Sequence, residues 1–394
     1  MKKALAIGAL ISLFSIGSAF ATDYVEIPFV PVSPEVMGRG DSIVADVHGY
    51  DSFFYNPAGY SRDNGSFTLS TANAWVYSRP DQAFNLAQQL IAGTNTTAGI
   101  LSFVNNQVTR GGIGAGASFG VGYVGNGLGL GAVVIVDSLL SGSTLLGMSG
   151  DLTGTIGFIG GLSVPFDVLG FKIHVGGDVR PMIRIHAPLT SSVALSLLTA
   201  VVSNADIIAA LDSADALYGV GIGLDIGTIA EIGWLSIGIS IRDLGGTSFR
   251  YDTASFGEVS NALQTQIEFP ATGTLVTADQ YTIPMNVMIG IALHPDMGSF
   301  NNIVDPSLSV DLTNVIGALS GTSSIWTLLH MGAELQLLSL FSLRGGLNQG
   351  YLTMGVGVKL LFLDLNFALF TQELGAHVGD QPNSGATLDV AIRW

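Results

Sequence analysis

One stretch of the sequence carries most of the side chains that could bind an anion. Apolar and polar residues alternate between positions 171 and 186, and the polar face holds Lys172, His174, Asp178, Arg180, Arg184 and His186. Because a guanidinium can grip a carboxylate through two hydrogen bonds, Arg180 and Arg184 could hold the anionic head group of a ligand. The alternative is that both arginines pair with neighbouring acids of the same interior, such as Asp178 or Asp225.

Metal binding and catalysis find little support in the sequence. His174 and His186 are possible ligand contacts, but the chain has no cysteine and no further histidine at ligand spacing from them, so no metal site is predicted. Residues 120–125 match the letters of a dinucleotide motif, yet they do not open a helix after a strand, so the match is chance. No nucleophile elbow, metalloprotease helix or phosphate loop is present. We therefore expect neither an enzyme nor a cofactor.

Two motifs in the N-terminal part of the chain could bring backbone close to another element. The first is Gly38-Arg39-Gly40 and the second is Tyr55-Asn56-Pro57-Ala58-Gly59. Glycine allows close backbone approach, and proline fixes the first φ of a turn. Residues 22–64 around them are rich in Pro, Gly and Asp and do not alternate. Such a segment cannot line lipid, so it must lie outside a membrane or inside a lumen.

The composition of the whole chain is that of a membrane protein. Charged residues make up 11% and hydrophobic residues 48%, there are 52 glycines, and the mean hydropathy is +0.51. A soluble protein of ordinary composition is about 25% charged. Removing two leader lysines from the 14 basic residues leaves 12 against 30 acidic residues, a net charge of −18 that excludes nucleic acid as a partner.

Strands rather than helices are predicted to cross the membrane, because only helices and closed barrels satisfy their backbone hydrogen bonds in hydrocarbon. Residues 111–136 have no basic residue and are long enough for a helix, but they contain ten glycines, many at a spacing of two. Each glycine costs a helix about 1 kcal/mol relative to alanine. Similar alternation recurs at 217–227 and 283–293. A secreted sandwich could also alternate, but the lengths and the scarcity of charge favour an all-β transmembrane antiparallel barrel.

About fourteen strands are expected, with short helices in the extracellular loops. The candidate stretches are 65–78, 97–105, 112–124, 127–138, 152–165, 171–187, 217–229, 233–243, 281–294, 305–313, 327–339, 341–348, 351–362, 363–372 and 385–394. Residues 81–93 and about 190–216 are predicted to be helical insertions. Residues 245–280 are polar and predicted to form an exposed loop. All four tryptophans fall near the ends of these stretches, where an indole prefers the headgroup level.

Both ends of the chain indicate the outer membrane of a bacterium. Residues 1–21 carry two lysines, an apolar run and Ala19-Phe20-Ala21, which is the pattern of a cleaved signal peptide. The last strand alternates and stops on Trp394, as in the C-terminal signal that outer-membrane barrels present to their assembly machinery. Outer-membrane lipid and that machinery are therefore expected partners.

The two N-terminal motifs resemble the hatch of the FadL-type long-chain fatty-acid channel family. A Met-Gly-Arg-Gly segment at 37–40 lies about fifteen residues before the aromatic-Asn-Pro-Ala-Gly segment at 55–59. Residues 343–357 and 372–375 also resemble FadL-like and PorV-like sequences. The resemblance implies a monomeric barrel of fourteen strands over 65–394 and a hatch over 22–64 that plugs it. It also implies hydrophobic ligands that leave sideways through a gap in the wall.

The resemblance gives the predicted loop helices a role as well. In FadL-like proteins such helices form a greasy entry groove, and Leu197, Leu198, Val201 and Val202 would line it here. The alternative is that the loop helices pack on each other over the mouth of the barrel.

Passive uptake of hydrophobic or amphipathic small molecules, such as long-chain fatty acids, is the leading hypothesis for function. One alternative is a PorV-like barrel that binds or shuttles envelope proteins, and another is a surface barrel whose loops face a host. A general porin is disfavoured, because residues 22–64 are expected to fill the lumen.

Overall fold

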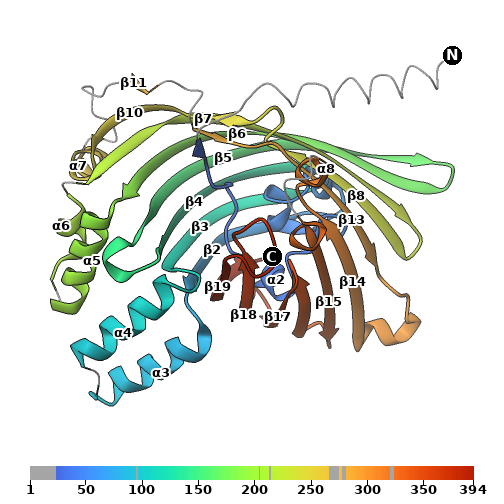
Figure 1. Ribbon diagram of the computed structural model, residues 1–394. Coiled ribbons are helices and arrows are strands. Elements are labelled where there is room, and N and C mark those ends of the chain that lie inside the picture. Colours follow the sequence, from blue (N-terminus) through green and yellow to red (C-terminus); the bar gives the residue numbers. More distant parts are fainter. Residues whose placement is uncertain are drawn as a thin grey trace.

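The computed structural model describes residues 24–94, 96–203, 205–212, 214–265, 275–276, 281–319 and 324–394. Within these residues fourteen antiparallel strands form a closed ring (Figure 1). The strands are β2 (Ser66–Tyr77), β3 (Ile113–Gly125), β4 (Leu128–Ser141), β5 (Ser149–Val168), β6 (Phe171–Leu189), β7 (Asp215–Ile232), β8 (Leu235–Arg242), β13 (Asn286–Leu293), β14 (Val304–Leu312), β15 (Leu329–Leu337), β16 (Phe341–Asn348), β17 (Tyr351–Leu360), β18 (Leu363–Glu373) and β19 (Pro382–Arg393). The prediction of a barrel of about fourteen strands is confirmed.

Pairing between the first and last strands completes the ring. Trp75 of β2 lies opposite Thr387 of β19, and every other neighbour in the ring is joined to the next by antiparallel pairing, including β7 with β8. Every strand of the ring therefore has a neighbouring strand on both sides, which is the condition for a sheet to stand in hydrocarbon.

The alternation read from the sequence is an alternation of burial. Along β6, Val175 and Val179 are exposed on the outside, whereas His174 and Arg180 face the inside and are fully buried. The outer face of the barrel is therefore apolar and the inner face polar, as a lipid-spanning barrel requires. Among the helices that the structure describes, none has the length and hydrophobicity to cross a membrane, a finding that does not concern strands.

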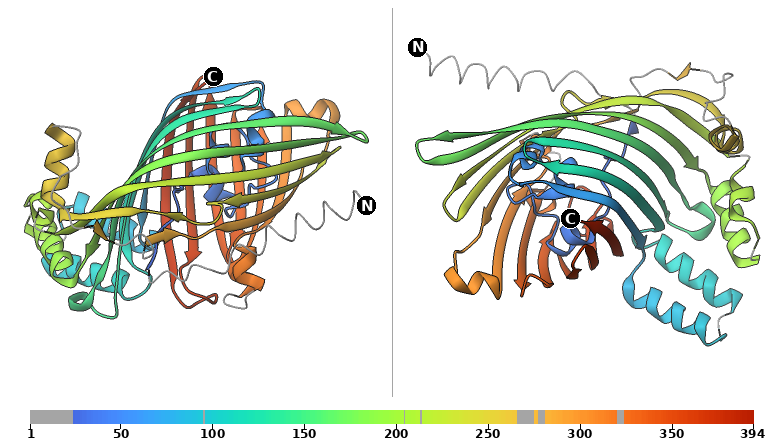
Figure 2. Two further views of the ribbon diagram at one scale, coloured as in Figure 1. Left: turned by 90° about the horizontal axis from the view of Figure 1, so that it is seen from above. Right: turned by 180° about the vertical axis from the view of Figure 1, so that it is seen from behind.

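The two ends of the barrel differ. At one end, called the turn end, short connections such as 126–127, 169–170 and 233–234 join the strands. The other end, called the loop end, carries the long connections, and the helices α3 to α7 gather there (Figures 1 and 2). These helices are α3 (Pro80–Ile91), α4 (Thr97–Val108), α5 (Ser191–Ser203), α6 (Ile207–Leu211) and α7 (Phe256–Thr265). The predicted helical insertions at 81–93 and 190–216 are confirmed.

Smaller elements complete the described chain. They are β1 (Tyr24–Val25), α2 (Pro34–Gly38), η2 (Gly49–Phe53), η3 (Pro57–Ser61), η4 (Leu145–Gly147), β9 (Thr247–Ser248), β10 (Arg250–Ser255), β11 (Leu275–Val276), β12 (Tyr281–Ile283), η6 (Gly298–Asn302), α8 (Val315–Leu319) and η7 (Ile325–Thr327). The predicted signal peptide at 1–21 lies outside the described residues.

The predicted strand at 97–105 is wrong, because this stretch belongs to helix α4. The Thr96 side chain accepts a hydrogen bond from the backbone N–H of Gly99 and so caps the helix N-terminus. Val104 and Val108 then pack in the apolar cluster around Met148. With so few apolar residues, the 3.6-residue period of a helix and the two-residue period of a strand are hard to distinguish in the sequence. The Thr96 cap favours the helix.

The prediction that residues 245–280 form an exposed polar loop is wrong for part of this stretch. Strand β10 extends the sheet by pairing with the loop end of β7, and the Phe249 and Tyr251 side chains are fully buried. The rings of these two residues stack with centroids 5.6 Å apart and lie against the inner face of the wall. Part of this stretch, 266–274 and 277–280, lies outside the described residues.

One tryptophan does not sit where the sequence suggests. Trp234, Trp326 and Trp394 are exposed, but the Trp75 side chain is buried inside the barrel, where its indole N–H donates to Asp137 at 2.7 Å. Its position at a strand end is as expected, but its direction is inward.

Candidate functional site: an internal plug and two cavities

Residues 26–62 lie inside the ring of strands and are called the plug (Figure 2). Its core is aromatic: Phe53 packs against Tyr50 and Tyr60, with ring centroids 5.5 and 5.8 Å apart, and the Phe53, Phe54 and Tyr60 side chains are fully buried. Burying one such ring contributes about 2 kcal/mol. The plug is therefore a packed body with its own apolar centre rather than a loose tail.

The Asn56–Gly59 turn docks on the wall at β6, β7 and β8. The Asn56 Oδ1 accepts a hydrogen bond from the Ala58 N–H at 3.1 Å, which caps η3, and its Nδ2 donates to the Val44 carbonyl at 3.0 Å. The same Nδ2 lies 3.4 Å from the carbonyls of Thr228 and Ile239, a residue pair at the β7–β8 seam. Asn56 thus joins two plug segments to the β7–β8 seam.

Lumen glycines make room for this turn. A Cβ on Gly227 of β7 would overlap the Asn56 Oδ1, and a Cβ on Gly176 of β6 would overlap the Pro57 carbonyl. Only a wall residue without a side chain allows the Asn56 amide and the Pro57 backbone to approach the wall so closely. The glycine alternation in the sequence therefore has a steric purpose at these positions.

The Gly38-Arg39-Gly40 motif docks on a different arc, at β15, β16 and β17. Gly40 has φ +67, and a Cβ there would overlap the Met331 carbonyl; a Cβ on Gly346 would overlap the Gly40 backbone nitrogen. Arg39 is buried, forms an ion pair with Asp46 and lies 3.6 Å from Glu334 of β15. The two motifs singled out in the sequence are thus two of the places where the plug lies in close contact with the wall.

Arg180 is the centre of a buried ionic network. Its Nη2 donates to Asp225 at 2.7 Å and to Asp243 at 3.1 Å, and its Nε lies 3.7 Å from Asp178. Asp178 accepts a 2.7 Å hydrogen bond from the Tyr60 hydroxyl of the plug. Arg180 therefore has the acidic neighbours that the sequence offered as the alternative to a ligand.

Arg184 and His186 contact the start of the plug instead. The Arg184 Nη1 donates to Glu26 at 2.9 Å, and its guanidinium lies 4.7 Å from the centroid of Phe249. Glu26 also accepts a 2.8 Å hydrogen bond from Tyr251 and lies 3.4 Å from His186. A single acid in the apolar run at the beginning of the plug thus meets three side chains of the barrel and its loops, Arg184, His186 and Tyr251.

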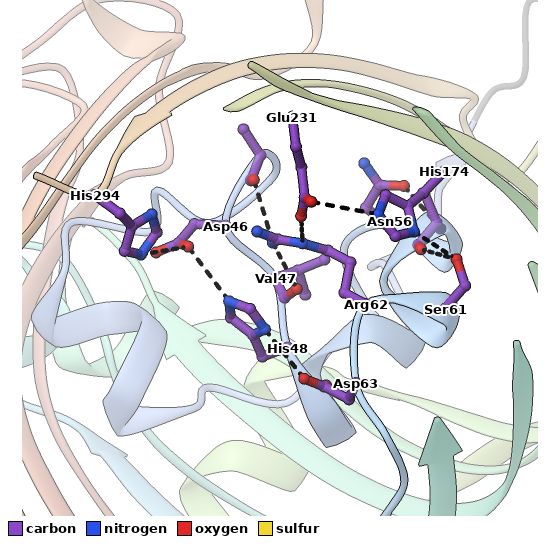
Figure 3. Close-up of polar contacts among 12 residues, drawn as sticks. Asp46, Val47, His48, Asn56, Ser61, Arg62, Asp63, His174, Glu231 and His294 are labelled. Atoms are coloured by element: carbon purple, nitrogen blue, oxygen red, sulfur yellow. Dashed lines mark hydrogen bonds and ion pairs between the residues drawn. The ribbon is translucent and has the colours of Figure 1, made fainter. Parts of the chain in front are cut away.

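His174 belongs to a third cluster, shown in Figure 3. Its Nδ1 lies 2.7 Å from the Ser61 hydroxyl and its Nε2 lies 3.6 Å from Glu231, which also accepts a 2.8 Å hydrogen bond from the Arg62 Nε. Arg62 further donates to the Val47 carbonyl. These contacts fix the end of the plug to β6 and β7.

His48 joins Asp46 of the plug to Asp63, the residue that follows the plug, on the turn side of the same region (Figure 3). Its ring nitrogens lie 3.5 Å from Asp46 and 3.4 Å from Asp63. Burial lowers the pKa of His48, but the hydrogen bonds to Asp46 and Asp63 outweigh it and raise the pKa to about 9. The His48 side chain is half exposed, so water screens these contacts and their effect is modest.

The His48 contacts should make plug stability depend on alkaline pH. Because the pKa is raised on folding, the stabilisation is complete below the unfolded value near 6.5 and is lost as the pH passes about 9. We expect plug opening, measured as ion conductance of single barrels, to rise between pH 7 and pH 10. In His48→Gln this rise should disappear; an identical rise in that variant would contradict the assignment.

A cavity of about 500 Å³ lies between the plug and the loop end. Apolar side chains of the plug and the wall line much of it, including Ile27, Val30, Met37, Phe54, Ile135 and Leu139. Polar groups are fewer: Asp41 accepts from the Tyr55 hydroxyl at 2.9 Å, Asp137 accepts from Trp75, and Arg242 donates to Asp225.

A second cavity, of about 430 Å³, lies at the turn end and has a different character. Its lining is charged and includes Glu35, Asp51, Asp63, Arg344, Lys359 and Arg393. The plug contributes to both linings and lies between them, so an apolar chamber and a charged chamber are separated by its packed aromatic centre.

The structure does not gather the predicted ligand contacts into either cavity. Among the described lining residues, His174, Arg180, Arg184 and His186 are absent from both cavities. Leu197, Leu198, Val201 and Val202 lie on α5, and Leu198 packs on the cluster that joins α4 and α5. Their role as an entry groove stays a prediction, as does the role of the four lumen residues.

Sequence reasoning missed the residues that line the apolar cavity. Trp75, Ile135, Asp137 and Arg242 come from three strands far apart in the chain, and alternation marks each of them only as an end-of-strand or inward position. For the pairing at Arg184 a signal did exist: Glu26, which does not line the cavity, is the only charged residue between positions 24 and 34. A lone charge in an apolar run needs a buried partner.

Comparison with known proteins gives a fold likeness at low sequence identity. No family model and no curated protein matches the sequence. The Ralstonia pickettii toluene transporter TbuX is 14% identical over 92% of this chain and 97% of its own, with a TM-score of 0.48. The Pseudomonas putida toluene transporter TodX is 10% identical over 95% and 99%, with a TM-score of 0.45. These likenesses are too loose to assign a function to the chain.

Proposed function

We propose that this chain is an outer-membrane channel through which hydrophobic or amphipathic small molecules diffuse passively. The observation that carries the proposal is the apolar cavity of about 500 Å³ between the loop end and a plug made by the chain's own N-terminal part. A concave chamber of this size that offers a ligand apolar side chains together with polar groups is typical of small-molecule sites. A ligand enters by burying its apolar body and leaves by partition into lipid.

In this proposal residues 22–64 act as the hatch and residues 65–394 as the transmembrane barrel. The signal peptide at 1–21 directs the chain across the inner membrane, and Trp394 presents the last strand to the assembly machinery. The ring at Trp394 is exposed and packs beside Phe67, with centroids 5.4 Å apart, so it is accessible at the turn end. A monomer suffices, because the ring is closed within one chain.

Long-chain fatty acids are the first ligands to test, because the resemblance to the FadL-type family implies them. Arg242 lines the cavity, and its Nη2 has no hydrogen-bond partner among the described residues, but this atom is buried and would meet a carboxylate only after the side chain moved. Four carboxylates that line the cavity disfavour an anionic ligand, because they repel its charge. They are Asp41, Asp137, Asp151 and Asp243. A fatty alcohol of equal chain length therefore belongs in the same experiment.

Sideways release would need the least disruption where β7 changes its partner. Residues 215–220 of β7 pair with β10 and residues 226–232 pair with β8, whereas 221–225 have no ladder partner on that side among the described strands. Phe249 covers this stretch from within, since a Cβ on Gly221 would touch its ring. Movement of Phe249 would open a path from the lumen to lipid.

The uptake experiment compares a labelled fatty acid, a matched fatty alcohol and small sugars in vesicles that contain the mature chain. We expect entry of one or both lipophilic probes and exclusion of the sugars. Rapid sugar entry without lipophilic uptake would reject the proposed channel and favour a porin.

Filling the cavity should abolish the uptake. Ile135 lines the chamber, so Ile135→Trp adds a ring where the ligand would lie, and we expect uptake to fall by about tenfold or more, the loss that corresponds to about 1.4 kcal/mol of binding. The control is Val136→Trp, one position along β4, whose side chain points outward. Equal uptake by the two variants would show that ligands do not use this chamber.

A further inference from the structure

The turn end exposes leucines in a backbone conformation that disfavours them. Leu169, Leu338 and Leu361 each have φ +55, in the left-handed region that glycine and asparagine adopt most easily. Leu169 and Leu361 are 92% and 90% exposed. In water, a strained backbone and a bare apolar side chain are both unfavourable, so hairpin folding alone does not account for leucine at these turns.

Exposed apolar side chains occur around most of the circumference at this end. Trp234 lies in the β7–β8 turn, Phe300 between β13 and β14, Phe362 in the β17–β18 turn and Trp394 at the end of β19, and all are more than half exposed. The β3–β4 turn is the polar exception: Asn126 has φ +53 and its Nδ2 donates to the Asn64 carbonyl. A protein partner of ordinary size would cover one arc, whereas a bilayer surrounds the whole ring.

The apolar tips continue the lipid-facing surface of the barrel. Outward side chains of β5 are exposed in an unbroken row that reaches Leu169, made of Leu162, Val164, Phe166 and Val168. The β5–β6 hairpin projects far beyond its neighbours at this end (Figures 1 and 2). The outer face of the strands meets lipid, and this row stays apolar up to the turn. The lipid-facing surface therefore extends as far as Leu169.

The lysines fit the same environment. After the leader the chain has two lysines, Lys172 and Lys359, and they lie within three residues of Leu169 and Leu361. Both side chains are exposed at the ends of their strands, although both stand on the inward-facing register and Lys359 also lines the charged cavity. An ammonium on a flexible stem can reach headgroup phosphates while its apolar neighbours enter the acyl region.

We propose that Leu169, Trp234, Leu338 and Leu361 form an apolar rim that lies in the boundary between lipid headgroups and acyl chains. The turns of this end then rest in the membrane instead of projecting into water. The inference does not depend on transport, because a barrel with any other function would carry the rim equally well.

The absence of cysteine allows a direct test of the rim. Leu169→Cys and Leu361→Cys are labelled with an environment-sensitive fluorophore in vesicles of phosphatidylcholine and phosphatidylglycerol. Asp81→Cys on α3 is the water-exposed control, and Ile222→Cys on the outer face of β7 is the lipid control. We expect the two rim labels to be quenched several-fold more by nitroxide lipids, and less by aqueous iodide, than the Asp81 label. Quenching by iodide to the level of Asp81 would overturn the proposal and point to a protein partner.

A second test asks whether Leu361→Asn stabilises or destabilises the folded barrel. Asparagine accommodates left-handed backbone better than leucine, so Leu361→Asn in a water-facing turn should stabilise the barrel. In the bilayer boundary the same change places an amide among acyl chains, and we expect the unfolding equilibrium in vesicles to shift several-fold toward the unfolded state. Leu146→Asn, on an exposed loop-end leucine, is the matched control. Unchanged or higher stability of Leu361→Asn would contradict the rim.

Discussion

Replacing Gly227 by leucine is expected to unseat the plug and open the barrel to small solutes. The new side chain would occupy the space of the Asn56 amide, which joins the Asn56–Gly59 turn to Val44 and lies against the β7–β8 seam. Overpacking costs about 1–3 kcal/mol, and each 1.4 kcal/mol is about tenfold in a population. We therefore expect sugar permeation of vesicles, measured by swelling, to rise by about tenfold or more.

A matched control separates plug displacement from general damage. Gly154 of β5 has open space where its Cβ would be, so Gly154→Leu adds the same side chain with no neighbour to displace. This variant should remain closed to sugars, and both variants should show the shift in electrophoretic mobility on heating that marks a folded barrel. A folded Gly227→Leu barrel that stays closed would show that this contact does not hold the plug.

Replacing Arg180 by methionine should destabilise the barrel strongly. Asp178, Asp225 and Asp243 would lose the guanidinium that lies within 3.7 Å of each of them, and the Arg180 side chain has no exposed surface through which water could compensate. Removing one partner of a buried ion pair costs about 3–5 kcal/mol. The measurement is the free energy of unfolding by urea in lipid vesicles, followed by tryptophan fluorescence.

The same variant distinguishes the two readings of Arg180. If Arg180 held a ligand head group, Arg180→Met would weaken ligand binding while the free energy of unfolding changed little. We expect the opposite, because Arg180 lies outside the lining of the apolar cavity among the described residues. Arg184→Met is a useful companion, since Arg184 contacts Glu26 at the start of the plug and its loss should loosen that end alone.

The glycine pattern shows how far sequence reasoning could go. A spacing of two excluded helices and indicated strands, and the structure confirms this at 113–125 and 128–141. Alternation could not explain why glycine rather than another small residue lines the lumen. That reason is the plug: its backbone approaches Gly176 and Gly346, and the Asn56 side chain approaches Gly227, so closely that a Cβ at any of the three positions would overlap it.

The polar face of residues 171–186 shows a second limit of reasoning from local periodicity. The sequence placed Arg180, Arg184, His174 and His186 on one inward face, and they do face inward and are buried. Their partners can be far away in the chain, since Arg184 and Glu26 are 158 residues apart. A period along one strand says which face a residue occupies, but it says nothing about what stands opposite across the lumen.

The sequence by itself determined the barrel, the approximate number of strands and the side of each strand that meets lipid, because alternation follows from the geometry of a single extended chain. The two N-terminal motifs were also visible in it as unusual turns. Only the tertiary structure decided that the plug divides the lumen into an apolar and a charged chamber, that β7 changes partner in mid strand, and that exposed leucines ring the turn end. These features arise from contacts between distant segments and from backbone angles at turns, and neither leaves a periodic trace along the chain.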